Sequence, residues 1–240
     1  MVLGSFDRFP KTPRKSARER EVCASPIHAI MQTMGALDVL EVDPVSGKKN
    51  TLATNVQRAL RALNASEIPY AVIGATALAV RGLPRMTRDL DVVVVIEDAF
   101  DALFALENAG FRSVAPIDRE EDPEPMYVMR RGADEVDVLV AAAEPESTVV
   151  AEATQAKVFG TKAPVATLEH LVLMYLYSNQ PRHLGDLARV VTESAVDLTK
   201  VERYLADVHP EMLVVLRDRV EAARRPPPAP PRPARRPRGK

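Results

Sequence analysis

The sequence has few of the residues that secreted, zinc-binding and membrane-spanning proteins require. Its 240 residues include a single cysteine, Cys23, so neither an internal disulfide nor a cysteine-based zinc site can form. The four histidines are scattered and show no HExxH spacing. No apolar run approaches the ~20 residues of a membrane span, and no apolar run followed by a small-residue cleavage site opens the chain. We therefore expect a cytoplasmic protein with no membrane partner.

The formal net charge of −1 conceals an uneven distribution of charge. Residues 1–20 contain six basic and two acidic residues, and residues 224–240 contain seven basic residues and no acid. Because the whole chain has 32 basic and 33 acidic residues, residues 21–223 contain 19 basic and 31 acidic ones. We interpret 1–26 as a basic disordered arm and 224–240 as a Pro/Arg-rich disordered tail. Such segments either only solubilise a protein or bind nucleic-acid phosphates.

The pattern of apolar residues predicts an α/β (α+β) fold with a small mixed sheet flanked by helices. Predicted strands lie at 70–73, 90–96, 111–115, 126–130 and 135–140, and predicted helices at 53–65, 75–81 and 99–108. After Pro164 the character changes, and helical patterns follow at 167–177, 184–192, 200–208 and 211–223. We therefore expect a domain over 51–164 and a C-terminal helical region over 165–223.

Three aspartates lie among the apolar residues of two predicted strands. Asp89 and Asp91 flank Leu90 at the start of a valine-rich strand, and strand alternation places both on one face. Asp137 lies in a second strand between valines, where a polar side chain is costly unless it is paired or binds a ligand. Carboxylates that converge from neighbouring strands repel one another, and Mg²⁺ prefers such oxygen ligands. The trio therefore predicts a site for divalent cations, two of which suit in-line phosphoryl transfer.

A glycine turn precedes these aspartates. Gly74, Ala75 and Thr76 lie between a predicted strand and a predicted helix. A glycine there lets the backbone approach a ligand, and a helix N-terminus offers N–H groups to phosphate. Arg85 and Arg88 lie between the turn and the aspartates, either as phosphate ligands or as ordinary surface residues. The arrangement predicts a site for a nucleoside triphosphate (NTP).

Residues 73–95 closely resemble the motif of the DNA polymerase β-like nucleotidyltransferase superfamily. The shared order is a glycine turn, a short helix, Arg-x-Thr-x-Asp-x-Asp and a lone aspartate on a later strand. Within the superfamily the chain is most similar to AbiE/MenT-type toxin nucleotidyltransferases and related bacterial proteins, over residues 55–192. The resemblance implies that Asp89, Asp91 and Asp137 bind Mg²⁺ and that the turn at Gly74 and Ala75 holds the nucleotide phosphates.

The chain departs from the family pattern at two places. It has Gly-Ala at the turn where the superfamily usually has Gly-Ser or Gly-Gly, and Thr76 could supply the missing hydroxyl. Tyr175 stands where toxin relatives carry a lysine that reaches the triphosphate, and we interpret Tyr175 and Tyr177 as core aromatics. Arg182 and Asp186 match the family pattern, either as nucleotide-binding residues or as an i,i+4 helix pair.

The resemblance implies Mg²⁺-dependent transfer of a nucleoside monophosphate from an NTP to an acceptor hydroxyl, with release of pyrophosphate. Asp89 and Asp91 would bridge two Mg²⁺ ions to the triphosphate, and Asp137 would hold the ion at the acceptor and help to take its proton. The implied acceptor is RNA, in particular a tRNA 3′ end, or a protein, and an antitoxin would be the partner. Two alternatives stay open: an antibiotic-type small-molecule nucleotidyltransferase, and a non-catalytic binding or regulatory module.

Overall fold

The computed structural model describes residues 51–178 and 180–225. The chain divides into two units, Met1–Gly35 and Ala36–Lys240, and every described residue belongs to the second. The predicted basic arm 1–26 lies outside the described residues, as does the predicted disordered tail 224–240 except for its first two residues, of which Arg224 ends a helix. Within the described ranges, no helix is long and apolar enough to cross a membrane.

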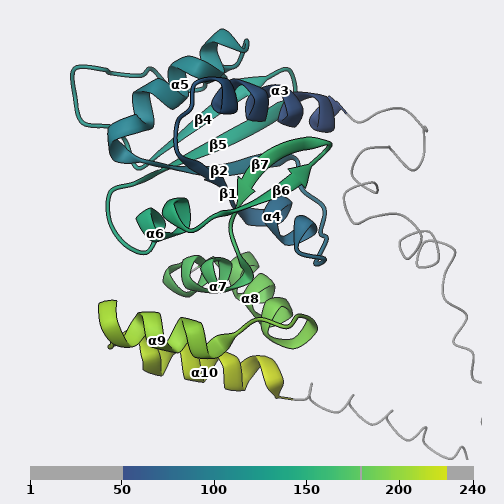
Figure 1. Ribbon diagram of the computed structural model, residues 1–240, viewed down its shortest axis with the longest axis vertical. Helices are drawn as coiled ribbons and strands as arrows, with labels where there is room; N and C mark the ends of the chain where they lie inside the picture. Colours follow the sequence, from purple (N-terminus) through teal and green to yellow (C-terminus); the bar gives the residue numbers. More distant parts are fainter. Residues whose placement is uncertain (1–50, 179, 226–240) are drawn as a thin grey trace, which may run out of the picture. The chain divides into compact units, whose positions relative to one another are not determined.

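Seven strands form one mixed sheet in the order β3-β4-β5-β2-β1-β7-β6 (Figure 1). They are β1 (Tyr70–Val72), β2 (Asp89–Val95), β3 (Arg112–Ser113), β4 (Met126–Arg131), β5 (Asp134–Ala141), β6 (Thr154–Val158) and β7 (Thr161–Val165). The central strand β2 runs parallel to β5 and antiparallel to β1, and β1 runs parallel to β7. The outer pairs β3–β4, β4–β5 and β6–β7 are antiparallel. The predicted mixed α/β fold is therefore confirmed.

Helices cover both sides of the sheet (Figure 1). Those within the sheet region are α3 (Thr51–Ala65), α4 (Gly74–Val80), α5 (Ala99–Asn108) and α6 (Glu146–Ala151), with a 3₁₀ turn at Ile96–Asp98. Four helices follow the last strand: α7 (Leu168–Tyr177), α8 (Pro181–Glu193), α9 (Leu198–Val208) and α10 (Met212–Arg224). Helices α3 and α5 pack on each other over one face, while α4 and α6 lie on the side of α7–α10.

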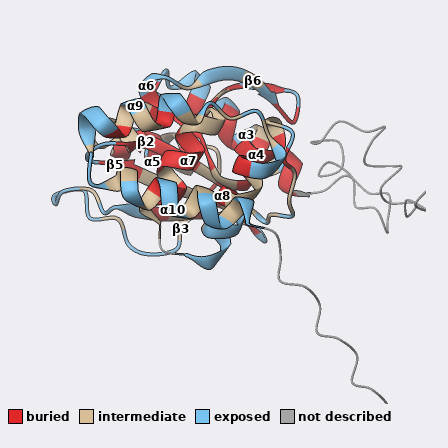
Figure 2. Ribbon diagram, turned by 90° about the horizontal axis from the view of Figure 1, so that it is seen from below, coloured by how far each residue is buried: buried red, intermediate tan, exposed pale blue. Residues whose placement is uncertain are grey.

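Alternation along the central strands determines which face carries polar residues. In β5, Val136 and Val138 are buried, whereas Asp137 between them is only partly buried. In β2, Leu90 is fully buried between two partly exposed aspartates. Figure 2 shows buried residues in the interior strands and on the inner sides of the helices. Because a shift of one residue would turn the aspartates into the core, burial of the valines fixes the register of the polar face.

The sequence patterns missed one helix and one hairpin between residues 141 and 165. Helix α6 has six residues, too few for a clear helical period. The β6–β7 hairpin turns at Phe159 and Gly160, which both have positive φ, and Phe-Gly is not one of the usual Asn-Gly or Asp-Gly turn signals. Strand β7 accommodates Pro164 because β1 pairs with it only at Val165. The hairpin extends the predicted sheet by two strands.

Candidate active site

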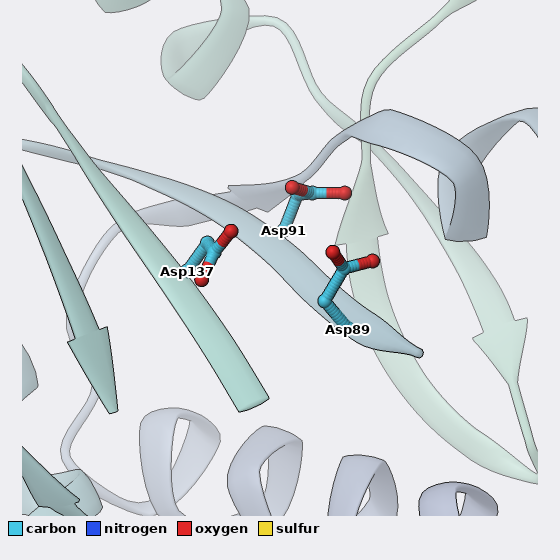
Figure 3. A group of neighbouring side chains, drawn as sticks. All are labelled: Asp89, Asp91 and Asp137. Carbon is cyan, nitrogen blue, oxygen red and sulfur yellow. The ribbon is translucent and has the colours of Figure 1, made fainter. Parts of the chain in front are cut away.

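Three carboxylates meet on one face of the two central parallel strands (Figure 3). Asp89 and Asp91 project from β2 and Asp137 from β5, and the register of the two strands pairs Asp91 with Asp137. One carboxylate oxygen of each residue lies within 4.8 Å of the corresponding atoms of the other two. The convergence that strand alternation predicts is therefore confirmed.

The proximity of the carboxylates disfavours their charged forms. Burial, followed by the charges of Asp89 and Asp137, raises the pKa of Asp91 to about 7, while Arg182 and Arg85 oppose this rise. Burial, followed by the charge of Asp89, also raises the pKa of Asp137. Like charges at this separation in a partly buried site repel strongly. The site is therefore one in which added positive charge would stabilise the carboxylates.

The trio fits a divalent cation. The Oδ1 atom of Asp137 is buried and has no hydrogen-bond partner among the described residues. A buried polar atom of this kind is costly unless it is paired or ligated. The hydroxyl of Thr87 donates a hydrogen bond to Oδ1 of Asp89, which orients that carboxylate. Oxygen ligands held by strands suit a hard cation such as Mg²⁺, which would also relieve the mutual repulsion.

Gly74 lies directly against one of these carboxylates. Its φ is +60°, and a Cβ at this position would stand 2.0 Å from Oδ2 and 2.6 Å from Cγ of Asp91. The amide of Ile73 donates a 3.0 Å hydrogen bond to the backbone carbonyl of Asp91, which ties the turn to β2. Only glycine combines this backbone conformation with such a close approach. The turn residue that the sequence singled out is thus in contact with the trio.

A cavity of about 320 Å³ lies beside the trio. Most of the site residues expected from the sequence line it: Gly74, Arg85, Asp89, Asp91, Asp137 and Arg182. The remaining four do not belong to its lining: Ala75 and Thr76 are buried in α4, Arg88 is exposed before β2, and Asp186 is buried in α8. The structure therefore gathers six of the ten expected residues around one cavity.

Asp186 reaches the site through Arg85. The exposed fraction of Asp186 is only 4%. Its carboxylate accepts a 2.9 Å hydrogen bond from Nε of Arg85. Arg85 lies on the segment before β2 and Asp186 on α8, so the ion pair joins the sheet region to the C-terminal helices. The partner of Asp186 is therefore Arg85 and not Arg182, one helical turn earlier.

The cavity also has lining residues that the sequence did not single out as a site. Tyr175 and Tyr177, interpreted as core aromatics, both line it, and their buried hydroxyls have no hydrogen-bond partner in the described chain. The ring of His183 lies 5.1 Å from that of Tyr175, and its Nδ1 is 2.6 Å from Oγ of Ser178. Glu146 of α6 adds a further carboxylate to the lining. The only sequence signal was the tyrosine in place of the family lysine.

Comparison with known proteins gives similar structures at low identity. No protein-family model matches the chain, and no curated protein matches it. ANT(2″)-Ia, solved in complex with adenylyl-2″-tobramycin, is 20% identical with a TM-score of 0.43, over 72% of this chain and 98% of that one. A nucleotidyltransferase-like antigen from Paracoccidioides brasiliensis is 18% identical with a TM-score of 0.41, over 70% and 93%. The lincomycin-bound lincosamide adenylyltransferase LnuA is 10% identical with a TM-score of 0.42, over 58% and 96%. A function has to be inferred from the site.

Proposed function

We propose that the chain is a Mg²⁺-dependent nucleotidyltransferase that moves a nucleoside monophosphate from an NTP to an acceptor hydroxyl. The observation that carries the proposal is the cluster of Asp89, Asp91 and Asp137, whose carboxylate oxygens lie within 4.8 Å of one another beside a cavity. Arg85 and Arg182 line the same cavity. Carboxylates for a cation and guanidinium groups for phosphate are the two requirements of phosphoryl transfer chemistry.

Each of these side chains has a role in the proposed reaction. Asp89, Asp91 and Asp137 would hold the metal, which when bound neutralises phosphate charge and orients the triphosphate. Arg85 and Arg182 would stabilise the charge that develops on the phosphate oxygens. The acceptor oxygen attacks the α-phosphorus as the bond to the bridging oxygen breaks, and pyrophosphate leaves with the bonding electrons. The carboxylate of Asp137, whose Oδ1 has no hydrogen-bond partner among the described residues, would accept the hydroxyl proton.

The first candidate acceptor is a hydroxyl of RNA, such as a tRNA 3′ end, or of a protein. In this reading the enzyme is a toxin that an antitoxin partner restrains. The resemblance of residues 55–192 to the toxin nucleotidyltransferases supports it, and so do the basic residues within 1–20 and 224–240, which suit a polyanionic acceptor.

The lining of the cavity favours a second candidate, a small-molecule acceptor. Met126, Leu139 and Met174 give it apolar walls, and Glu146 and Tyr177 add a few polar groups. Concave, mostly apolar sites with few polar groups are typical of small-molecule binding. A carboxylate in the lining also repels RNA phosphates. The complete aspartate trio argues against a third reading, a module without catalytic activity.

Labelled nucleotides test the proposed reaction. Each NTP, labelled on either the α- or the γ-phosphate, is incubated with the full chain, Mg²⁺ and, separately, total RNA, lysate protein or a set of hydroxylated small molecules. We expect one acceptor class to gain α-label but no γ-label, with release of pyrophosphate. Transfer of α-label and release of pyrophosphate should both be lost in EDTA and in Asp137→Asn. Transfer of γ-label would indicate a kinase, and absence of both Mg²⁺-dependent NTP binding and label transfer would favour the non-catalytic module.

A further inference from the structure

The tyrosine hydroxyls of this protein divide into two groups. All five tyrosines lie within the described residues, and three of them, Tyr70, Tyr127 and Tyr204, each make a hydrogen bond of 2.8 Å through the hydroxyl. The other two, Tyr175 and Tyr177, have buried hydroxyls with no hydrogen-bond partner among residues 51–178 and 180–225, and both line the cavity beside the aspartate trio. The unpaired hydroxyls therefore coincide with the proposed site.

A hydroxyl buried in this way is not neutral for the fold. Tyr175 is 3% exposed, and its hydroxyl has lost water without gaining a hydrogen bond to any residue that the structure describes. Such groups are few in native proteins, and each one calls for an explanation such as a functional role, an ion or a water. Because Tyr175 lines the cavity, a bound substrate is the simplest partner for its hydroxyl.

Several charged side chains lie near enough to Tyr175 to act on its hydroxyl. They are those of Asp186, Arg85, Asp91 and Arg182. Asp186 is neutralised by its 2.9 Å ion pair with Arg85. The remaining charges are those of Asp91, a member of the aspartate trio, and of Arg182, whose guanidinium group would receive phosphate.

The second hydroxyl lies in different surroundings. The charges that act on Tyr177 are those of Glu211 and Glu146, and its ring packs edge-on against His209 at 5.4 Å. Acidic groups do not attract a triphosphate, whereas guanidinium groups do. The nucleotide is therefore expected at the Tyr175 end of the cavity and not at the Tyr177 end.

We propose that Tyr175 is a nucleotide-binding residue whose hydroxyl donates a hydrogen bond to the phosphate chain of the NTP. This proposal rests on the proposed function, because it takes the nucleotide as the ligand of the cavity. Burial of the ring and its contact with His183 restrict the side chain to few rotamers before the nucleotide arrives. A restricted side chain loses little conformational entropy when the nucleotide binds. Most of the free energy of its hydrogen bond therefore contributes to the affinity for the nucleotide.

Tyr175→Phe removes the hydroxyl and keeps the ring. The affinity is measured by calorimetry in Mg²⁺ for the α,β-methylene analogues of ATP, GTP, CTP and UTP, and for inorganic tripolyphosphate. We expect Kd to rise roughly tenfold for all five probes, the effect of one hydrogen bond to a charged group. The unliganded variant should unfold at the same or a higher urea concentration, because no protein hydrogen bond is lost.

Tyr70→Phe is the matched control. It removes the same atom, but its hydroxyl bonds Asn64 outside the cavity lining. We expect this variant to unfold at a lower urea concentration than the wild type and to bind all five probes with unchanged Kd. Tyr175→Phe should thus weaken nucleotide binding without loss of stability, and Tyr70→Phe should lower stability without a change in binding.

Each other outcome overturns a defined part of the inference. Unchanged Kd in Tyr175→Phe, or a loss of stability equal to that of Tyr70→Phe, would show a structural hydroxyl and overturn the proposal. A loss confined to one nucleobase, with tripolyphosphate unaffected, would overturn the phosphate contact. If the wild type binds none of the probes, the proposed function itself fails, and the inference fails with it.

Discussion

Replacing Gly74 with alanine would separate the geometry of the site from the stability of the fold. The new Cβ would stand 2.0 Å from Oδ2 and 2.6 Å from Cγ of Asp91, whereas ordinary contact begins at 3.4 Å. The carboxylate therefore has to move by more than 1 Å, away from its present place in the trio. The backbone, with φ at +60°, carries a separate cost.

Backbone strain at residue 74 should be seen in the free energy of unfolding, and displacement of the Asp91 carboxylate should be seen in activity and nucleotide binding. An alanine in the left-handed region costs about 1–2 kcal/mol, so the free energy of unfolding should fall by that amount and the protein should still fold. Displacement of a reacting or ligating group by about 1 Å can reduce activity on the order of 100-fold. We therefore expect Gly74→Ala to lose nucleotide transfer and Mg²⁺-dependent nucleotide binding almost completely.

Gly132→Ala provides the control for backbone strain. Gly132 has a φ of +66°, nearly that of Gly74, and a Cβ there would meet nothing within 4 Å. Urea unfolding should show a similar loss of stability in both variants, while calorimetry with Mg²⁺ and an ATP analogue should show a loss of binding only in Gly74→Ala. Equal binding and equal label transfer in the two variants would refute the close contact with Asp91.

Three further changes probe other parts of the structure. Asp137→Asn should raise the thermal midpoint in EDTA, because burial and Asp89 raise the pKa of this carboxyl, and should abolish stabilisation by Mg²⁺; a lower midpoint in EDTA would contradict this. Arg85→Met and Asp186→Asn should show a coupling of about 2 kcal/mol in a double-mutant cycle of urea unfolding, whereas additive effects would deny the ion pair. Burial lowers the pKa of His170 below 6.5, so the stability from its neutral form is complete above pH 6.5 and is lost as the pH falls through the lowered value. His170→Gln should therefore lose less stability than the wild type between pH 7.5 and 5, and identical losses would contradict this.

The sequence predicted the centre of the site because short-range periodicity determines it. Alternation puts Asp89 and Asp91 on one face of β2, and the buried valines of both strands leave one register that brings Asp137 beside them. The glycine turn could also be predicted locally, since Gly74 follows the apolar strand β1 and begins the short helix α4. Local pattern and tertiary packing agree at these positions.

Other parts of the site depend on contacts that no local pattern records. The ion pair between Arg85 and Asp186 joins residues 101 positions apart, so the spacing of Asp186 from Arg182 suggested the wrong partner. Helix α7 is apolar around most of its surface, which hides the face on which Tyr175 meets the cavity. The β6–β7 hairpin was missed because its turn residue Phe159 has a positive φ that its sequence does not signal.

Binding of Mn²⁺, followed by electron paramagnetic resonance, tests most directly whether the three carboxylates hold a divalent cation with a nucleotide. The full chain is titrated with Mn²⁺ in the presence and absence of α,β-methylene-ATP, beside Asp89→Asn, Asp91→Asn and Asp137→Asn. We expect the wild type to bind Mn²⁺ more tightly with the nucleotide, and each variant to bind it at least tenfold more weakly. Equal Mn²⁺ affinity in the wild type and all three variants would contradict the assignment of the trio as the metal site.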